Sequence, residues 1–157
     1  AEVLSEFTEP KVWRTTYEGK GTLYGELLRA KVSFIAYPFF LPARPFINYG
    51  AVRILEAHDI AVMKIVAISQ RGTKRDFFDL YWTCHHLEPL ETTIERLKVQ
   101  YPSVGHDYHH ILKSLVYFND AEADPEPDLC FKATWKEVKG FFTKQVPVIA
   151  VTVMGLT

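Results

Sequence analysis

The chain has 157 residues, 48% of them hydrophobic and 14% aromatic, and a formal net charge of −1. This length fits one domain, or one domain with part of another, and the composition excludes a disordered protein. A net charge near zero also excludes a global basic field that would attract nucleic acid, so any anion site must be local.

No apolar stretch approaches the roughly 20 residues of a membrane helix, and no signal peptide opens the chain. Cys84 and Cys130 lie far apart without the spacing of metal ligands. We therefore expect a cytoplasmic protein with two reduced thiols, a disulfide being the alternative.

The first part of the chain predicts a three-stranded meander. Residues 12–17 and 22–28 are rich in β-branched and aromatic side chains, and Gly19-Lys20-Gly21 between them indicates a hairpin turn. Residues 31–37 alternate between apolar and polar side chains and predict the third strand, which ends at Pro38.

The segment after Pro38 is expected to be irregular. Pro42 and Pro45 lack the N–H group that a strand ladder needs. Residues 52–55 predict one short strand before the helices begin.

The next residues predict two consecutive helices. Asp59 is the expected N-cap of a helix over residues 60–70, with Gly72 as its C-terminal stop. Thr73 is the expected cap of a second helix over residues 74–87.

Three further helices are predicted over residues 90–100, 108–118 and 135–142. The acidic, proline-containing residues 120–127 between the last two predict a solvated loop. Residues 146–156 are apolar and β-prone, and the sequence leaves open whether they form a strand, a docked tail or an interface.

Strands followed by helices predict an α+β fold class: a small antiparallel or mixed sheet followed by a helical bundle. The sheet is expected in residues 1–57 and the helical region in residues 58–157, packed as one unit.

Lys64 lies within the apolar run from Ile60 to Ile68. A helix that is apolar on nearly all sides is buried, so the ammonium group needs a partner or a route to water. One interpretation is that it reaches solvent along its own stem. The other is a lysine that binds a phosphate as a point charge.

Asp76 and Asp79 lie one helical turn apart, so their side chains reach the same spot. The structural interpretation is a capping box between Thr73 and Asp76, with Asp79 paired to Arg75. The functional interpretation is a carboxylate that orients Lys64 or helps to place a nucleotide or a metal. Both remain open from the residues alone.

Other motifs are weaker. Histidines at 85, 86, 106, 109 and 110 are spaced for helices, but no acid or cysteine completes a metal set, so no metal ligands are predicted. A Ser-His-Asp nucleophile elbow, a P-loop and a GxGxxG motif are all missing from the sequence.

The residues around Lys64 resemble the AbiEii/AbiGii toxin family of nucleotidyltransferases. The matching residues are Asp59-Ile60-Ala61-Val62-Met63-Lys64, Ala67-Ile68, Arg71-Gly72 and Lys74-Arg75-Asp76-Phe77-x-Asp79-Leu80-Tyr81. Weaker similarity extends from about residue 12 to residue 143.

The resemblance implies a nucleotidyltransferase sheet with a helical C-terminal region. It implies transfer of a nucleotide from an NTP, with Mg²⁺, to an RNA or protein acceptor, in bacterial toxin–antitoxin or abortive-infection systems. An antitoxin protein is the implied partner, and the oligomeric state stays open.

The resemblance also assigns roles to residues. Lys64 is the motif lysine that contacts the triphosphate, and Asp76 is the motif aspartate that orients it or helps to activate the acceptor hydroxyl. Arg71, Lys74 and Arg75 are expected to guide phosphate or RNA. Asp79 belongs to the same block of nucleotide-binding residues.

The chain departs from the family at its first motif. The Gly-Ser turn and the Asp-x-Asp pair that holds the metal do not occur in it, and a third motif carboxylate falls near Ser33. Because the chain begins at Ala1, we expect that the N-terminal part is lost from it. We therefore expect a chain that is inactive alone and that binds neither Mg²⁺ nor NTP by itself.

Two alternatives remain. The first is a non-catalytic interaction module with a degenerate nucleotidyltransferase fold, using Trp13, Phe39, Phe40 and the apolar tail as its interface. The second, a helical RNA-binding domain, is disfavoured by the net charge.

Overall fold

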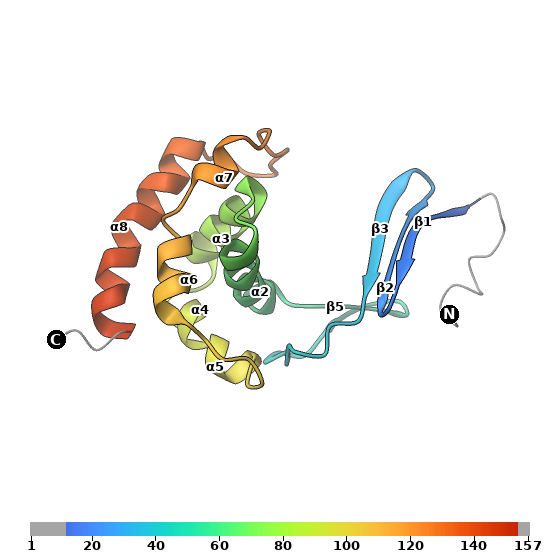
Figure 1. The fold of residues 1–157 in the computed structure, drawn as a ribbon, viewed down its shortest axis with the longest axis horizontal. Helices are drawn as coiled ribbons and strands as arrows, with labels where there is room; N and C mark the ends of the chain where they lie inside the picture. The colour runs from blue at the N-terminus through green and yellow to red at the C-terminus, as the bar shows by residue number, and fades with distance from the viewer. Residues whose placement is uncertain (1–11, 154–157) are drawn as a thin grey trace. The chain divides into compact units, whose positions relative to one another are not determined.

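The structure, a computed structural model, describes residues 12–153 and divides into two compact units, the first ending at Pro38 and the second beginning at Phe39 (Figure 1). Antiparallel strands precede helices, which confirms the α+β fold class. The contact boundary lies earlier than the division expected after residue 57. The assignment of a partial nucleotidyltransferase sheet to residues 1–57 stays a prediction.

The first unit is the expected meander. Strands β1 (Trp13–Gly19), β2 (Thr22–Leu27) and β3 (Ala30–Ile35) pair antiparallel in the order β1-β2-β3. The predicted turn joins β1 to β2, and Gly21 adopts a φ of 71°, which glycine tolerates without steric cost. Ser33 lies exposed on β3, opposite Tyr24.

The second unit begins with a hairpin of which only one strand was predicted. Strand β5 (Val52–Ile54) was expected, and β4 (Ile47–Tyr49) pairs with it antiparallel. Pro45 precedes the first residue of β4, so its missing N–H does not interrupt the hydrogen bonds between the two strands. Gly50 in the turn has a φ of 60°. Every residue of both strands is exposed.

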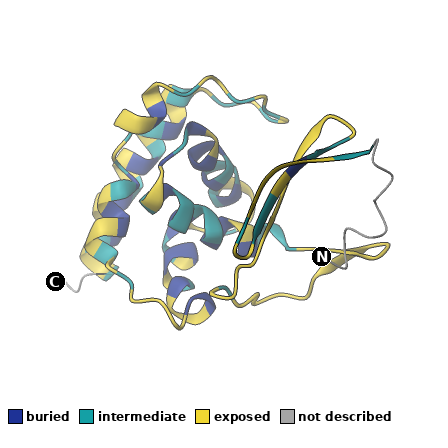
Figure 2. Cartoon of the chain, turned by 45° about the vertical axis from the view of Figure 1, so that its right-hand side comes forward, coloured by how far each residue is buried: buried dark blue, intermediate teal, exposed yellow. Residues whose placement is uncertain are grey.

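Seven helices follow among the described residues. They are α2 (Ala57–Gln70), α3 (Lys74–His86), α4 (Leu90–Glu95), α5 (Leu97–Gln100), α6 (Tyr108–Ser114), α7 (Asn119–Glu122) and α8 (Trp135–Val153). Their buried apolar side chains form one core, whereas the strands carry mostly exposed residues (Figure 2). Phe77 of α3 lies at its centre, with ring contacts to Phe118, Trp135 and Phe142.

Several helix limits differ from the prediction. The helix expected over residues 90–100 breaks at Arg96, and short α7 lies in the stretch predicted as a loop. Helix α8 continues past residue 142, through Pro147, to Val153. The apolar ending is therefore helical up to that point, and residues 154–156 lie outside the described residues.

Asp59 is not the N-cap of α2, because Glu56 takes that position and Asp59 is fully buried in the first turn. Its carboxylate accepts hydrogen bonds from Arg96 Nη2 at 2.7 Å and from Gln100 Nε2 at 2.7 Å. Arg96 in turn donates to Glu88 at 2.8 Å. This ion network fixes α2, which carries Lys64, against α4 and α5.

Within residues 12–153, no helix is long and apolar enough to cross a membrane. Both cysteines are free thiols, as expected. Burial, with a smaller effect of Glu88, raises the pKa of Cys84 to about 12, so this thiol is unreactive at neutral pH.

Candidate functional site

The structure brings Lys64, Asp76 and Asp79 together. Lys64 Nζ donates to Asp76 Oδ1 at 2.9 Å and lies 2.6 Å from Asp79 Oδ2. The Lys64 side chain is 21% exposed, so its ammonium group is neither sealed in the core nor free in water. An ammonium has three N–H donors, and the third has no partner among the described residues.

Asp76 is held by three side chains, and its own side chain is only 2% exposed. Besides Lys64, Arg71 donates from Nε at 3.1 Å and from Nη2 at 3.4 Å, and Thr73 Oγ1 donates at 2.6 Å. Both carboxylate oxygens therefore accept two donors each. Asp76 is an anchor for the cations around it and has little capacity left for another ligand.

The expected capping box does not form. Thr73 is the N-cap residue of α3, as predicted, but its side chain makes no capping bond and instead donates to the Asp76 carboxylate. Asp79 pairs with Lys64 and not with Arg75. Its side chain is 40% exposed, and Oδ1 has no partner within the described chain.

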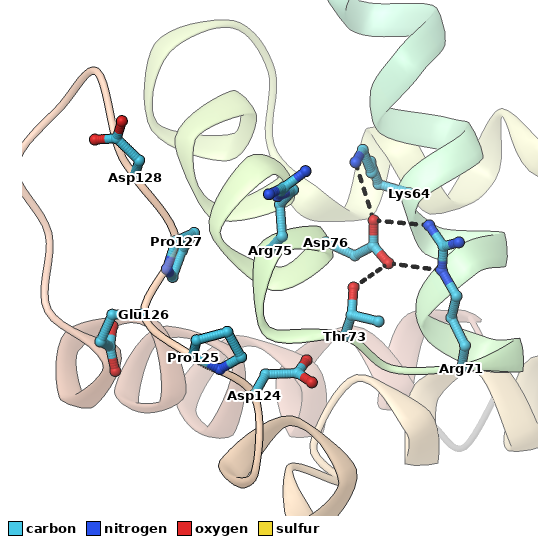
Figure 3. Close-up of a pocket in the computed structure, with 10 residues that line it drawn as sticks. All are labelled: Lys64, Arg71, Thr73, Arg75, Asp76, Asp124, Pro125, Glu126, Pro127 and Asp128. Carbon is cyan, nitrogen blue, oxygen red and sulfur yellow. Dashed lines mark hydrogen bonds and ion pairs between the residues drawn. The ribbon is translucent and has the colours of Figure 1, made fainter. Parts of the chain in front are cut away.

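An open pocket of about 460 Å³ lies beside this cluster (Figure 3). Residues of α2, α3 and the turn between them form one wall, and residues 124–128 form the other. The first wall consists of Lys64, Arg71, Thr73, Arg75 and Asp76. Arg75 is exposed and has no ion-pair partner among the residues that the structure describes, so it is the cation most available to a ligand.

Lys74 behaves differently from the other two basic residues of the turn. It is 5% exposed, and its Nζ donates to the Asp124 backbone carbonyl at 2.7 Å and to Glu126 Oε1 at 3.1 Å. The family resemblance implies that Lys74, like Arg71 and Arg75, guides phosphate or RNA. Its ammonium group is instead directed into the protein.

The surrounding charges and hydrogen bonds keep Lys64 and Asp76 ionised. For Lys64, burial lowers the pKa, but hydrogen bonds and charge attraction from Asp79 and Asp76 outweigh it, so the pKa rises. For Asp76, burial raises the pKa, but hydrogen bonds from Thr73, Lys64 and Arg71 outweigh it, so the pKa falls. Both groups therefore stay charged through the neutral range.

These directions predict a pH dependence of stability. A carboxylate with a lowered pKa stabilises the fold above its unfolded value of about 3.9, and this contribution disappears as the pH falls through the folded value. Asp76→Asn should therefore lower the melting temperature by the same amount at about pH 6 and about pH 8. The difference should shrink below about pH 4, measured by circular dichroism. A difference that grows on acidification would contradict the pairing.

Some site residues carried no sequence signal of their own. Thr73 appeared as a helix cap, and residues 124–128 appeared as a solvated loop. Asp124, Glu126 and Asp128 line the pocket. Only their acidic character was visible, because nothing local shows that a segment 50 residues away meets α3.

The described residues contain no cluster of metal-ligating side chains. They contain no group of three or more His, Cys, Asp or Glu side chains that could hold an ion. The ring nitrogens of His85 and His86 lie 2.9 Å and 2.8 Å from backbone carbonyls one turn back. Beside Lys64, the two carboxylate oxygens of Asp76 already accept four donors, so Asp76 is poorly suited to bind Mg²⁺.

Comparison with known proteins assigns the family. The chain belongs to the AbiEii family, because the family model described as "Nucleotidyl transferase AbiEii toxin, Type IV TA system" matches residues 25–150. The α+β fold is consistent with a nucleotidyltransferase-like architecture.

A curated relative supports this assignment. An uncharacterised protein of Aquifex aeolicus (strain VF5) is 38% identical over 135 residues, which cover 85% of this chain and 64% of the relative. The chain thus spans about 64% of that relative's length. No solved structure matches the chain.

Proposed function

We propose that this chain carries the triphosphate-binding part of an AbiEii-type nucleotidyltransferase. The complete protein transfers a nucleotide from an NTP to an RNA or protein acceptor, as part of a bacterial toxin–antitoxin or abortive-infection system in the cytoplasm. The family match and the Lys64 geometry support this proposal. The single observation that carries it is a partly exposed lysine, held by two carboxylates at a pocket, with one donor to spare.

Each residue has a role in the proposal. Lys64 contacts the triphosphate with its remaining N–H, and Asp76 orients Lys64. Because both Asp76 oxygens are already occupied, orientation suits it better than taking a proton from the acceptor hydroxyl. Arg75 and Arg71 attract the phosphates, and Asp79 shares the task of holding Lys64.

The proposed chemistry needs a metal, for which the described residues hold no cluster of three or more ligating side chains. Transfer at an α-phosphate normally requires an ion to neutralise developing charge. No group of ligands for it lies in residues 12–153. In our proposal, this chain contributes phosphate binding, and the metal-holding carboxylates belong to the complete protein.

This division of labour gives a direct test. The purified 157 residues, incubated with Mg²⁺, each radiolabelled NTP and bulk RNA, should transfer no label above a protein-free control. The same preparation should bind inorganic tripolyphosphate in a calorimetric titration, because binding needs Lys64 and the arginines but no metal pair. Rapid label transfer by this chain would contradict the division, and the lack of any tripolyphosphate binding would contradict the site.

The second candidate function is a non-catalytic module that binds an antitoxin protein. The observation in its favour is the exposed apolar hairpin, in which Ile47, Tyr49 and Val52 are 52%, 78% and 61% exposed. Of the interface candidates proposed from sequence, Phe40 is less suitable, because it packs on Tyr101 with ring centroids 5.2 Å apart. Trp13 is half-buried and packs near Phe34.

Light scattering separates the two functions. The chain would be mixed with a candidate antitoxin protein, and the mass of the mixture measured after gel filtration. A stable complex that is lost in Tyr49→Ser, combined with no tripolyphosphate binding, favours the module. Tripolyphosphate binding that depends on Lys64 favours the enzyme.

A further inference from the structure

The segment from Asp124 to Asp128, which we call the acidic wall, has few hydrogen bonds within itself. It has no regular secondary structure, and Pro125 and Pro127 have no backbone N–H to donate. Three of its five residues are acidic and repel one another. One local backbone hydrogen bond, from the Asp124 N–H to the Ala121 carbonyl at 3.2 Å, holds its start, so its position as one side of the pocket depends largely on contacts with other segments.

Lys74 supplies three hydrogen bonds to this segment. Its Nζ donates to the Asp124 carbonyl at 2.7 Å and to Glu126 Oε1 at 3.1 Å. Its backbone N–H donates to Asp124 Oδ2 at 2.8 Å. Asp124 thus accepts the first backbone N–H of α3, which has no partner within the helix, and places a negative charge at the helix N-terminus.

The burial of Lys74 argues against a direct role in phosphate binding. Its side chain is 6% exposed, and its Nζ also lies over the Trp135 ring, 5.6 Å from the centroid. To reach a ligand, the ammonium would have to leave the partly buried Asp124 carbonyl without its donor, which costs free energy. Glu126, its ionic partner, is 67% exposed, so the ion pair itself contributes little.

We propose that Lys74 is a positioning residue that fastens the acidic wall to the start of α3 and so sets the width of the pocket opposite Arg75. This inference rests on the proposed function, because the pocket beside Arg75 is the one in which we propose that the triphosphate binds. The figure of the site shows both sides, with Arg75 on α3 and residues 124–128 on the facing segment (Figure 3).

The test combines two measurements on Lys74→Met, Lys74→Arg and a matched control, Lys139→Met. Lys139 also lies 5.6 Å from the Trp135 ring and pairs with an acid, Glu122, but does not line the pocket. The first measurement is amide hydrogen exchange of residues 124–131 in the ligand-free chain. The second is the dissociation constant for inorganic tripolyphosphate.

Lys74→Met should speed exchange of the wall by about tenfold and weaken tripolyphosphate binding by about tenfold. Lys74→Arg should restore much of both, because it keeps the charge and the donors. Lys139→Met should change neither. Weaker binding with unchanged exchange would mean that Lys74 touches the phosphate itself and would overturn the proposal, as would no change in either measurement.

Two further results keep the inference separable from the proposed function. If Lys74→Met does not fold, Asp124→Ala removes another of the three hydrogen bonds, the one that the Asp124 carboxylate accepts from the Lys74 backbone N–H, and should also speed exchange of the wall. If the unmodified chain binds no tripolyphosphate, the phosphate-binding function fails. The fastening by Lys74 is then decided by exchange alone, and unchanged exchange in both variants overturns it.

Discussion

Lys64→Met in the complete protein is expected to reduce nucleotidyl transfer by about 10²–10³-fold, the usual loss when one preorganised charge is removed from a transferring group. Methionine is similar in length to lysine but carries no charge. Its ammonium group joins Asp76, Asp79 and the pocket, so the loss should also appear as weaker binding of tripolyphosphate to the present chain.

Lys132→Met is the matched control, because Lys132 is exposed and has no part in the pocket. Transfer is measured with radiolabelled NTP, and folding of each variant is checked by its melting temperature. Lys64→Met that retains full tripolyphosphate affinity, with a melting temperature close to that of the control, would contradict the role given to Lys64.

Asp59→Ala is expected to have the largest effect on stability, a loss of about 3–5 kcal/mol in the free energy of unfolding. The carboxylate is fully buried and accepts hydrogen bonds from Arg96 and Gln100. Backbone N–H groups of Ala43 and Arg44 point at it as well. Its removal leaves the Arg96 guanidinium, 17% exposed, with Glu88 as its remaining acid.

The urea concentration at which the helical unit of the full chain is half unfolded measures this effect. Glu122→Gln serves as the control, because Glu122 forms an exposed ion pair with Lys139, and its midpoint should stay unchanged. An Asp59→Ala midpoint equal to that of the control would show that the buried network does not hold α2 against α4 and α5.

The pairing of Lys64 with Asp76 could be predicted because its determinants are local. An apolar helix that stops before Gly72, followed by a second helix capped by Thr73, brings a lysine of the first helix beside an acid of the second. The same reasoning correctly gave the meander of the first unit, where glycine turns and alternating side chains lie in consecutive residues.

Interactions between distant residues could not be predicted. Asp59 has the sequence signature of an N-cap, and only the meeting with Arg96 and Gln100 makes it a buried ion. Lys74 has the signature of a phosphate guide next to Arg75, and only the approach of Asp124 shows that it is directed inward. In both cases the partner lies tens of residues away, and local pattern carries no information about it.

The predicted length of the last helix was wrong for a different reason. Val146, Val148 and Val151 are β-branched and favour strands, and Pro147 disfavours a helix interior. Burial of Val146 and Ile149 against the helical core outweighs these preferences.

The central claim is that Lys64 contacts the triphosphate in the pocket between α3 and the acidic wall. The most direct measurement is a crystal structure of the complete protein with a non-hydrolysable NTP analogue. We expect a phosphate oxygen about 3 Å from Lys64 Nζ, with Asp76 still bound to Lys64 and Arg75 turned toward the phosphates. A triphosphate bound elsewhere, with Lys64 contacting only Asp76 and Asp79, would contradict it.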